Sequence, residues 1–223
     1  RGRRKQPMLS AAEQYQANLA VLTTKNPAMA EQIEQFPMTN LALFPGQSGA
    51  LCGNVYDVPT QQWIGLAHPV DPLTEAEADC DKLYTPTQKV FCLLGLGLGY
   101  FAVAFAKRLH PWQRLCVWEL DPNCFKAMLY AVDVRPLFSD KRVDLFVGPE
   151  ILNQVEPWWL NLDVYDKLHI VPPMTAGYIT QYMADRWAVL LEKTGDMLRH
   201  HMVGLSTWKI FGKLIGDNDL RNM

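Results

Sequence analysis

From residue 90 onward, the chain alternates short continuous apolar runs with stretches in which apolar residues recur at helical spacing. Four of the apolar runs have the length of buried strands: residues 90–94, 115–120, 143–147 and 168–171. Helical patterns follow the first three, over residues 100–109, 122–131 and 150–161. Strands that alternate with helices are parallel and joined by right-handed crossovers. The pattern therefore predicts an α/β fold, a Rossmann-like three-layer domain with a parallel sheet.

A different pattern precedes this unit. Ser10 and Glu13 form a capping box at the start of a helix that reaches about Thr24, and a second helical pattern covers residues 28–36. Three short β-like runs follow, over residues 41–44, 50–58 and 63–67. Residues 59–62 favour a hairpin turn between the last two runs. We expect a leading helical and β-hairpin module over residues 1–70.

The segment after residue 70 begins the Rossmann-like domain, which we expect over residues 71–200. Thr74 can cap a helix over residues 75–83, with acidic residues in its first turn. Helical patterns also cover residues 178–200 and 207–215. The last of these suggests that residues 201–223 form a helix linking to a further C-terminal domain.

Composition and charge narrow the class of protein. The 223 residues are 49% hydrophobic and 20% charged, which is ordinary for a globular domain. A net charge of −2 argues against a protein built to neutralise phosphates, so no nucleic-acid partner is expected. The five cysteines show no Cys-x-x-Cys spacing, which predicts no zinc site and a reducing, cytoplasmic compartment. No apolar run reaches about eighteen residues, so no membrane span is expected.

The candidate binding site begins where the first apolar strand ends. Gly95, Gly97 and Gly99 alternate with leucines, and a helix opens at Tyr100. Glycines at such a strand-to-helix turn let backbone N–H groups approach a ligand, and the helix N-terminus favours an anionic or polar group. This context predicts a nucleotide-type site.

Acidic residues follow the second strand at the position where a ribose would be held. Glu119 could accept hydroxyl groups of a ribose, and Asp121 follows it immediately. A purely structural role is an equally good interpretation of both residues. Glu119 could face water or cap the next helix, and Asp121-Pro122 is an ordinary helix start. A ligand would lie outside the strand ends, among residues 95–99, 119–121, 148–149 and 171–175.

Several other chemistries are not indicated. The third glycine comes one position early for a nicotinamide-binding Gly-x-Gly-x-x-Gly, no Gly-Lys-Ser/Thr of a P-loop follows, and no Gly-x-Ser-x-Gly elbow is present. His200 and His201 are adjacent in a helical pattern and point about 100° apart, so a structural role is expected. No metal site and no catalytic residue is predicted.

Five segments together resemble one family. They are the loop Gly95-Leu-Gly-Leu-Gly-Tyr100, the turn Glu119-Leu-Asp121-Pro122, the run SDKRVDLFVG over residues 139–148, the segment His68…Asp71-Pro72…Glu75-Ala76-Glu77, and Thr207-Trp208. In these residues the chain resembles the motility accessory factor family. That family consists of flagellin glycosyltransferases that attach nonulosonic (sialic-acid-like) sugars.

The resemblance implies a place in a larger enzyme. In that family the matching residues belong to an N-terminal Rossmann-like domain, and the transferase domain follows it. The transferase domain is related in fold to sialyltransferases and to 6-hydroxymethylpterin diphosphokinase-like proteins. The resemblance therefore implies an accessory domain, with flagellin or another acceptor protein and the C-terminal transferase domain as partners.

Three hypotheses stay open at this point. The first is the accessory domain of such a glycosyltransferase, whose loop holds a nucleotide or CMP-type nucleotide-sugar, or is a relic of such a site. The second is a methyltransferase that uses the same loop and Glu119 for S-adenosylmethionine. The third is a non-catalytic module that docks another protein. Gly97→Asp is expected to abolish nucleotide binding and to leave the fold largely intact.

Overall fold

A four-stranded parallel sheet forms the centre of the fold. The computed structural model describes residues 9–160, 168–171, 188–189 and 192–193. Strands β4 (Val90–Leu94), β5 (Arg114–Glu119), β6 (Val143–Val147) and β7 (Leu168–Val171) lie in the order β6-β5-β4-β7, and every neighbouring pair is parallel. The predicted α/β Rossmann-like sheet is confirmed. The strand order runs from β4 to β6 on one side and then places β7 on the other side of β4, so the order reverses between β4 and β7.

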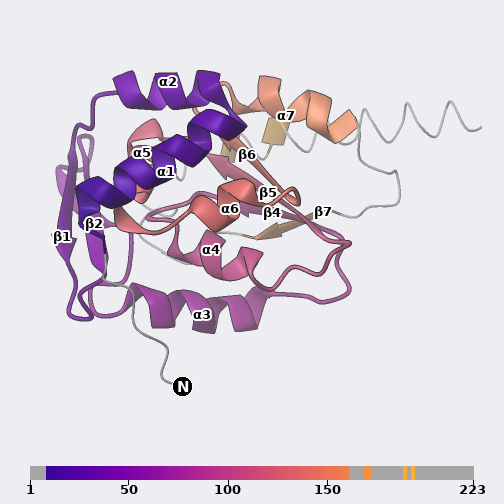
Figure 1. Ribbon diagram of the computed structural model, residues 1–223, viewed down its shortest axis with the longest axis horizontal. Helices are drawn as coiled ribbons and strands as arrows, with labels where there is room; N and C mark the ends of the chain where they lie inside the picture. Colours follow the sequence, from indigo (N-terminus) through magenta and orange to yellow (C-terminus); the bar gives the residue numbers. More distant parts are fainter. Residues whose placement is uncertain (1–8, 161–167, 172–187, 190–191, 194–223) are drawn as a thin grey trace, which may run out of the picture.

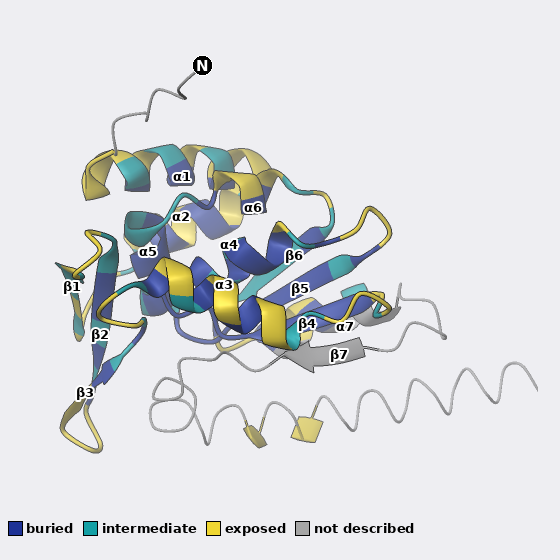
Figure 2. Ribbon diagram, turned by 90° about the horizontal axis from the view of Figure 1, so that it is seen from below, coloured by how far each residue is buried: buried dark blue, intermediate teal, exposed yellow. Residues whose placement is uncertain are grey.

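Helices cover both faces of this sheet. Those that follow β4 to β6 are α4 (Tyr100–Ala106), α5 (Pro122–Ala131), α6 (Arg135–Ser139) and α7 (Ile151–Leu160). Phe91 of β4 stands in register with Leu115 and Val143, and its ring packs edge-on against Phe105 of α4, 4.9 Å away. Phe146, three residues after Val143, therefore points to the opposite face, where it meets Trp158 of α7. The three-layer arrangement follows, with β4 and nearly all of β5 buried at its centre (Figure 2).

The leading segment contains two helices and a small antiparallel sheet. Its elements are α1 (Ala11–Lys25), α2 (Pro27–Gln35), β1 (Leu41–Pro45), β2 (Leu51–Asp57) and β3 (Gln62–Gly65), followed by α3 (Pro72–Leu83). The strands lie in the order β1-β2-β3, and α3 packs against α4. Figure 1 shows this small sheet standing at one end of the molecule, across the ends of the parallel strands. The helix-and-hairpin prediction is confirmed.

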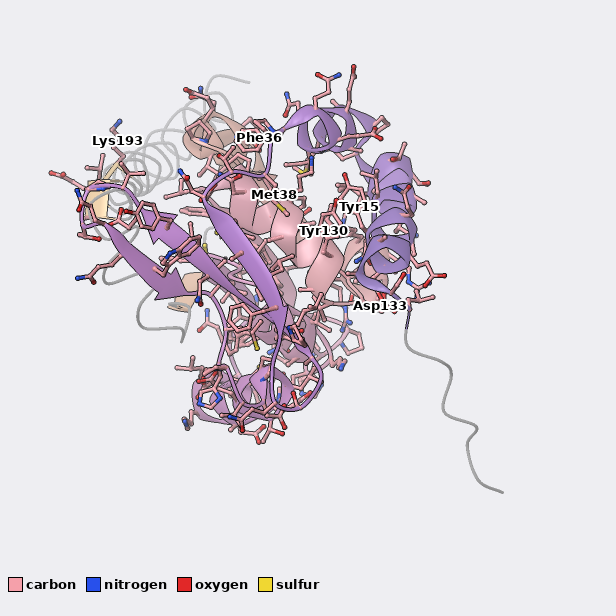
Figure 3. All side chains as sticks on the ribbon, turned by 90° about the vertical axis from the view of Figure 1, so that its left-hand side faces the viewer. Tyr15, Phe36, Met38, Tyr130, Asp133 and Lys193 are labelled. Carbon is pink, nitrogen blue, oxygen red and sulfur yellow. The ribbon has the colours of Figure 1, made fainter. Side chains whose placement is uncertain are left out.

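The helix α1 is joined to the Rossmann-like unit by a buried asparagine and a ring stack. Asn18 is fully buried; its amide donates to the carbonyls of Leu129 and Val132, and its oxygen accepts from Val134 N–H. The rings of Tyr15 and Tyr130 stack 4.3 Å apart (Figure 3).

One continuous hydrophobic core runs through both parts of the chain. Buried side chains of α1, α2, β2 and β3 belong to the same cluster as those of β4, β5 and α5. Burial of shared apolar surface is the main force that holds such units together. The boundaries predicted at residues 70 and 200 stay predictions.

Some local predictions were wrong in detail. The N-cap of α3 is Asp71, whose carboxylate accepts from Leu73 and Thr74 N–H, so Thr74 lies inside the helix. Pro72 at the first helical position explains this earlier start, because its ring is compatible with a first turn and needs no hydrogen-bond partner. The hairpin turn covers residues 58–61, one residue earlier than expected. The short helix α6 was not predicted.

The patterns at residues 178–200 and 207–215 fall outside the described residues, apart from positions 188–189 and 192–193. Across the ranges that the structure describes, none of the helices combines the length and the apolar character needed to cross a bilayer.

Candidate functional site

The glycine-rich loop joins β4 to α4 in a conformation that requires its glycines. Gly95, Gly97 and Gly99 have φ angles of 76°, 53° and 82°, in the left-handed region where side chains with a Cβ are strained. Gly95 N–H donates to the carbonyl of Trp118 on β5 over 2.7 Å. Gly99 N–H donates back to the Leu96 carbonyl over 2.8 Å, immediately before α4 begins. The alternating glycines are therefore explained by the turn itself.

Glu119, the predicted ribose ligand, lies at the end of β5 and is fully buried. Its Oε2 accepts from Leu96 N–H over 2.7 Å, and its Oε1 accepts from Asp121 N–H over 2.8 Å. A buried carboxylate is stable only when such donors replace water. Glu119 thus ties the loop after β4 to the turn after β5, and both of its oxygens hold amides of the chain itself.

Asp121 and Tyr100 also contact the chain itself. Asp121 is the N-cap of α5, and its Oδ1 accepts from Asn123 N–H over 2.8 Å. The Tyr100 hydroxyl lies 2.8 Å from the Leu51 carbonyl of β2 and 3.2 Å from the Ala131 carbonyl at the end of α5. Burial raises the pKa of Tyr100, which therefore stays a neutral donor. It links the small sheet to the Rossmann-like unit.

Parts of the chain distant in sequence cover the loop. A Cβ added at Gly97 would lie 2.7 Å from the Leu66 carbonyl oxygen, which follows β3, and one added at Gly99 would meet Met128 of α5. The cavity left beside the loop has a volume of about 30 Å³ and includes Glu75 and Asp79 in its lining. This is room for about one water molecule, whereas ligand pockets measure roughly 300–1,000 Å³.

The structure thus brings the six predicted contact residues together but buries all of them. They are Gly95, Gly97, Gly99, Tyr100, Glu119 and Asp121. Binding of a nucleotide or of S-adenosylmethionine by these residues stays a prediction. The geometry also corrects one expectation: Gly97→Asp would not leave the fold intact, because the new Cβ would collide with the Leu66 backbone at a φ that already favours glycine.

A second, larger cavity lies at the end of β6. Its volume is about 490 Å³, and it opens between α2, the first turn of α5 and the link from β6 to α7. The lining combines apolar side chains with amides: Met29, Gln32, Ile33, Gln35, Phe36, Pro37, Pro122, Val147, Gly148, Pro149, Glu150 and Gln154. Residues 148–149 were expected to lie near a ligand, because they follow the end of a parallel strand. Nothing in the sequence of α2 indicates that it would line the same cavity.

The described residues do not indicate metal chemistry. Among them, no three or more His, Cys, Asp or Glu side chains gather closely enough to hold a metal ion. All five cysteines are buried thiols, and burial raises the pKa of Cys80 to about 12. A thiol with so high a pKa is a poor nucleophile at neutral pH.

Comparison with known proteins finds a distant likeness among solved structures. No protein-family model and no curated protein matches the chain. Among solved structures, it is similar to the structure of MAf glycosyltransferase from Magnetospirillum magneticum AMB-1, with 16% sequence identity and a TM-score of 0.47. The likeness covers 78% of this chain and 35% of that chain, so this chain spans about a third of the other's length. An identity of 16% does not establish a family.

Proposed function

We propose that this chain is a non-catalytic, Rossmann-like accessory domain of a motility-accessory-factor-like glycosyltransferase. The parent enzyme would act in flagellin glycosylation with nonulosonic (sialic-acid-like) sugars, and its chemistry would belong to a C-terminal transferase domain. The observation that carries the accessory role is the buried Glu119 carboxylate, whose two oxygens accept from Leu96 and Asp121 N–H. Because this carboxylate is fully buried and ties the loop after β4 to the turn after β5, a ribose could reach it only if these two segments separated, and the buried amides would then lose their partner.

The segments that resemble the family support a shared scaffold more than a shared catalytic site. Asp71 caps α3, Glu119 ties two loops, and Asp140 pairs with Arg142 directly before β6. Each of these acidic residues therefore has a structural partner within the chain. A resemblance carried by such residues is what a shared supporting domain would leave in the sequence.

Calorimetric titration of the chain with CMP, CMP-sialic acid and S-adenosylmethionine tests the accessory role. We expect no binding of any of them near micromolar concentrations. Micromolar binding of S-adenosylmethionine, with amide shifts at residues 95–99 in NMR spectra, would overturn the proposal in favour of a methyltransferase. Binding of a cytidine nucleotide at the same amides would place donor recognition in this domain and would equally overturn it.

The glycosyltransferase assignment has its own test. The complete gene product that carries this chain is incubated with flagellin and a CMP-activated nonulosonic sugar, and the mass of flagellin is measured. We expect a mass increase of one or more sugar residues. An unchanged mass, with a correctly folded protein and with an established flagellin glycosyltransferase as positive control, would contradict the assignment.

A further inference from the structure

Among the strands that the structure describes, β6 forms an edge of the parallel sheet. Its pairing with β5 is framed by two hydrogen bonds, from Leu115 N–H to the Arg142 carbonyl and from Gly148 N–H to the Glu119 carbonyl. In a parallel ladder, alternate residues direct both main-chain groups to the same neighbour. Even-numbered residues of β6 therefore bond to β5, and the odd-numbered residues direct their N–H and C=O groups away from the sheet.

Side chains occupy the two ends of this outer edge. Lys25 Nζ, at the end of α1, donates to the Val143 carbonyl over 2.8 Å, and Gln154 Nε2 of α7 donates to the Val147 carbonyl over 3.0 Å. Between them, the N–H and C=O of Leu145 and the N–H of Val147 have no hydrogen-bond partner among the described residues. These three groups have the spacing needed to hydrogen-bond a neighbouring strand.

The open edge lies in a groove. Helices α1 and α2 form one wall and α7 forms the other, since Trp158 packs on Phe146 and its Nε1 donates to Asp144. Helices α2 and α7 lie along the same side of the molecule as β6 (Figure 1). Two cavities follow the strand, one of about 490 Å³ at Val147 and one of about 180 Å³ at Leu145, and Met29 lines both.

We propose that this groove binds an extended polypeptide segment of another protein, which adds to β6 as a fifth strand. The unpaired groups of Leu145 and Val147 would bond its main chain, and the cavity of about 490 Å³ would take a large apolar side chain. A strand fits better than a helix, because a helix satisfies its own main chain and would leave these groups unpaired. The lining carries one cation, Lys25, and two anions, Asp144 and Glu150, and Arg114 pairs with Asp144, so the segment is one of low net charge.

The test begins with a display library of random peptides of about ten residues, long enough to span the strand. Peptides enriched on the intact chain are resynthesised, and their affinity is measured by fluorescence anisotropy.

Leu145→Pro removes the outward N–H, and Leu145→Ala is its matched control, which shortens the side chain and keeps the N–H. Gln32→Trp fills the larger cavity from the exposed side of α2, and Glu31→Trp places the same side chain one position away, outside the lining.

We expect Leu145→Pro and Gln32→Trp to weaken binding at least about tenfold, and Leu145→Ala and Glu31→Trp to weaken it far less. Thermal melting checks that each variant is folded. Only alternate amides of a bound strand would face β6. N-methylation of one alternate set of peptide amides should therefore abolish binding, and N-methylation of the other set should spare it. Failure to enrich any peptide, or equal affinity for Leu145→Pro and Leu145→Ala, would overturn the proposal, as would equal sensitivity to methylation of either set.

Discussion

The two strand ends that could hold a ligand differ in what fills them. Beside β4 and β5, the glycine-rich loop carries the sequence features of a nucleotide site, but the chain's own groups occupy it and leave about 30 Å³. Beside β6 there is no such motif, yet a cavity of about 490 Å³ and an open strand edge are present. The comparison teaches that a binding motif and a binding space are separate properties.

The physical difference lies in how the polar groups are satisfied. At the loop, the Glu119 carboxylate and the amides of Leu96 and Asp121 satisfy each other in a buried setting. At β6, Lys25 and Gln154 satisfy only the outermost carbonyls of the edge. Separating buried polar groups from their partners is costly, so the closed site resists a ligand, whereas the half-buried groups of Leu145 and Val147 can bond a ligand without breaking an existing pair.

Glu119→Ala gives the largest expected effect and tests the closed site directly. Removing the carboxylate leaves two buried amides without their acceptor, and we expect a loss of about 2–5 kcal/mol in the free energy of unfolding, measured by urea denaturation. Glu119→Gln, which keeps one acceptor oxygen, should cost less. If Glu119→Ala were as stable as the native chain, the carboxylate would be available to a ligand and the comparison would fail.

The cover over the loop is tested by Gly97→Ala, with Gly49→Ala as its control. Both glycines have positive φ, but a Cβ at Gly49 would meet nothing within 4 Å, whereas one at Gly97 would meet the Leu66 backbone. We expect losses of about 1 kcal/mol for Gly49→Ala and about 2–3 kcal/mol for Gly97→Ala in the same denaturation experiment. Equal losses would mean that the Leu66 backbone does not pack against Gly97.

The smallest effect concerns the approach to β6 and depends on pH. The Arg142 guanidinium, hydrogen-bonded to Asp140, lowers the pKa of that carboxyl, and Asp140 also accepts from Arg142 N–H. Because the pKa is lower in the folded state, the carboxylate contributes stability above its unfolded pKa of about 4 and loses it as the pH falls through the folded value. Asp140→Asn should therefore cost up to about 1 kcal/mol at pH 7.

That difference should shrink as the pH falls from about 4 toward 2, where both chains carry a neutral group at position 140. Thermal melting of the two proteins across this range measures it. A difference that stays constant with pH would show that the ion pair contributes nothing and that Asp140→Asn acts only through the hydrogen bonds that the amide nitrogen cannot accept.

Much of the fold could be predicted because its signals are local. The strands Val90–Leu94, Val143–Val147 and Leu168–Val171 and the helix Pro122–Ala131 match their apolar patterns residue for residue. Ser10 and Glu13 form their capping box as expected. The helix α6 was missed because a single turn of five residues is too short to show a helical period.

For the candidate site, the sequence indicated which residues lie together but not which groups they bond. The spacing of the glycines and of Glu119 correctly indicated that the two strand ends meet, since the carboxyl ends of neighbouring parallel strands lie together. It could not show the direction in which Glu119 points. Asp121 as a helix cap was one of the two alternatives that the pattern left open, and the structure shows it in that role.

The sequence by itself determined the parallel strands, the glycine turn and the residues that meet at the strand ends, because these depend on periodicity and on backbone conformation within a few residues. Only the tertiary structure decided which strand end is closed and which is open. Leu66 covers Gly97, and α2 stands away from β6, through packing between segments far apart in the chain. Such packing is set by the shape and volume of the shared core, which no local pattern records.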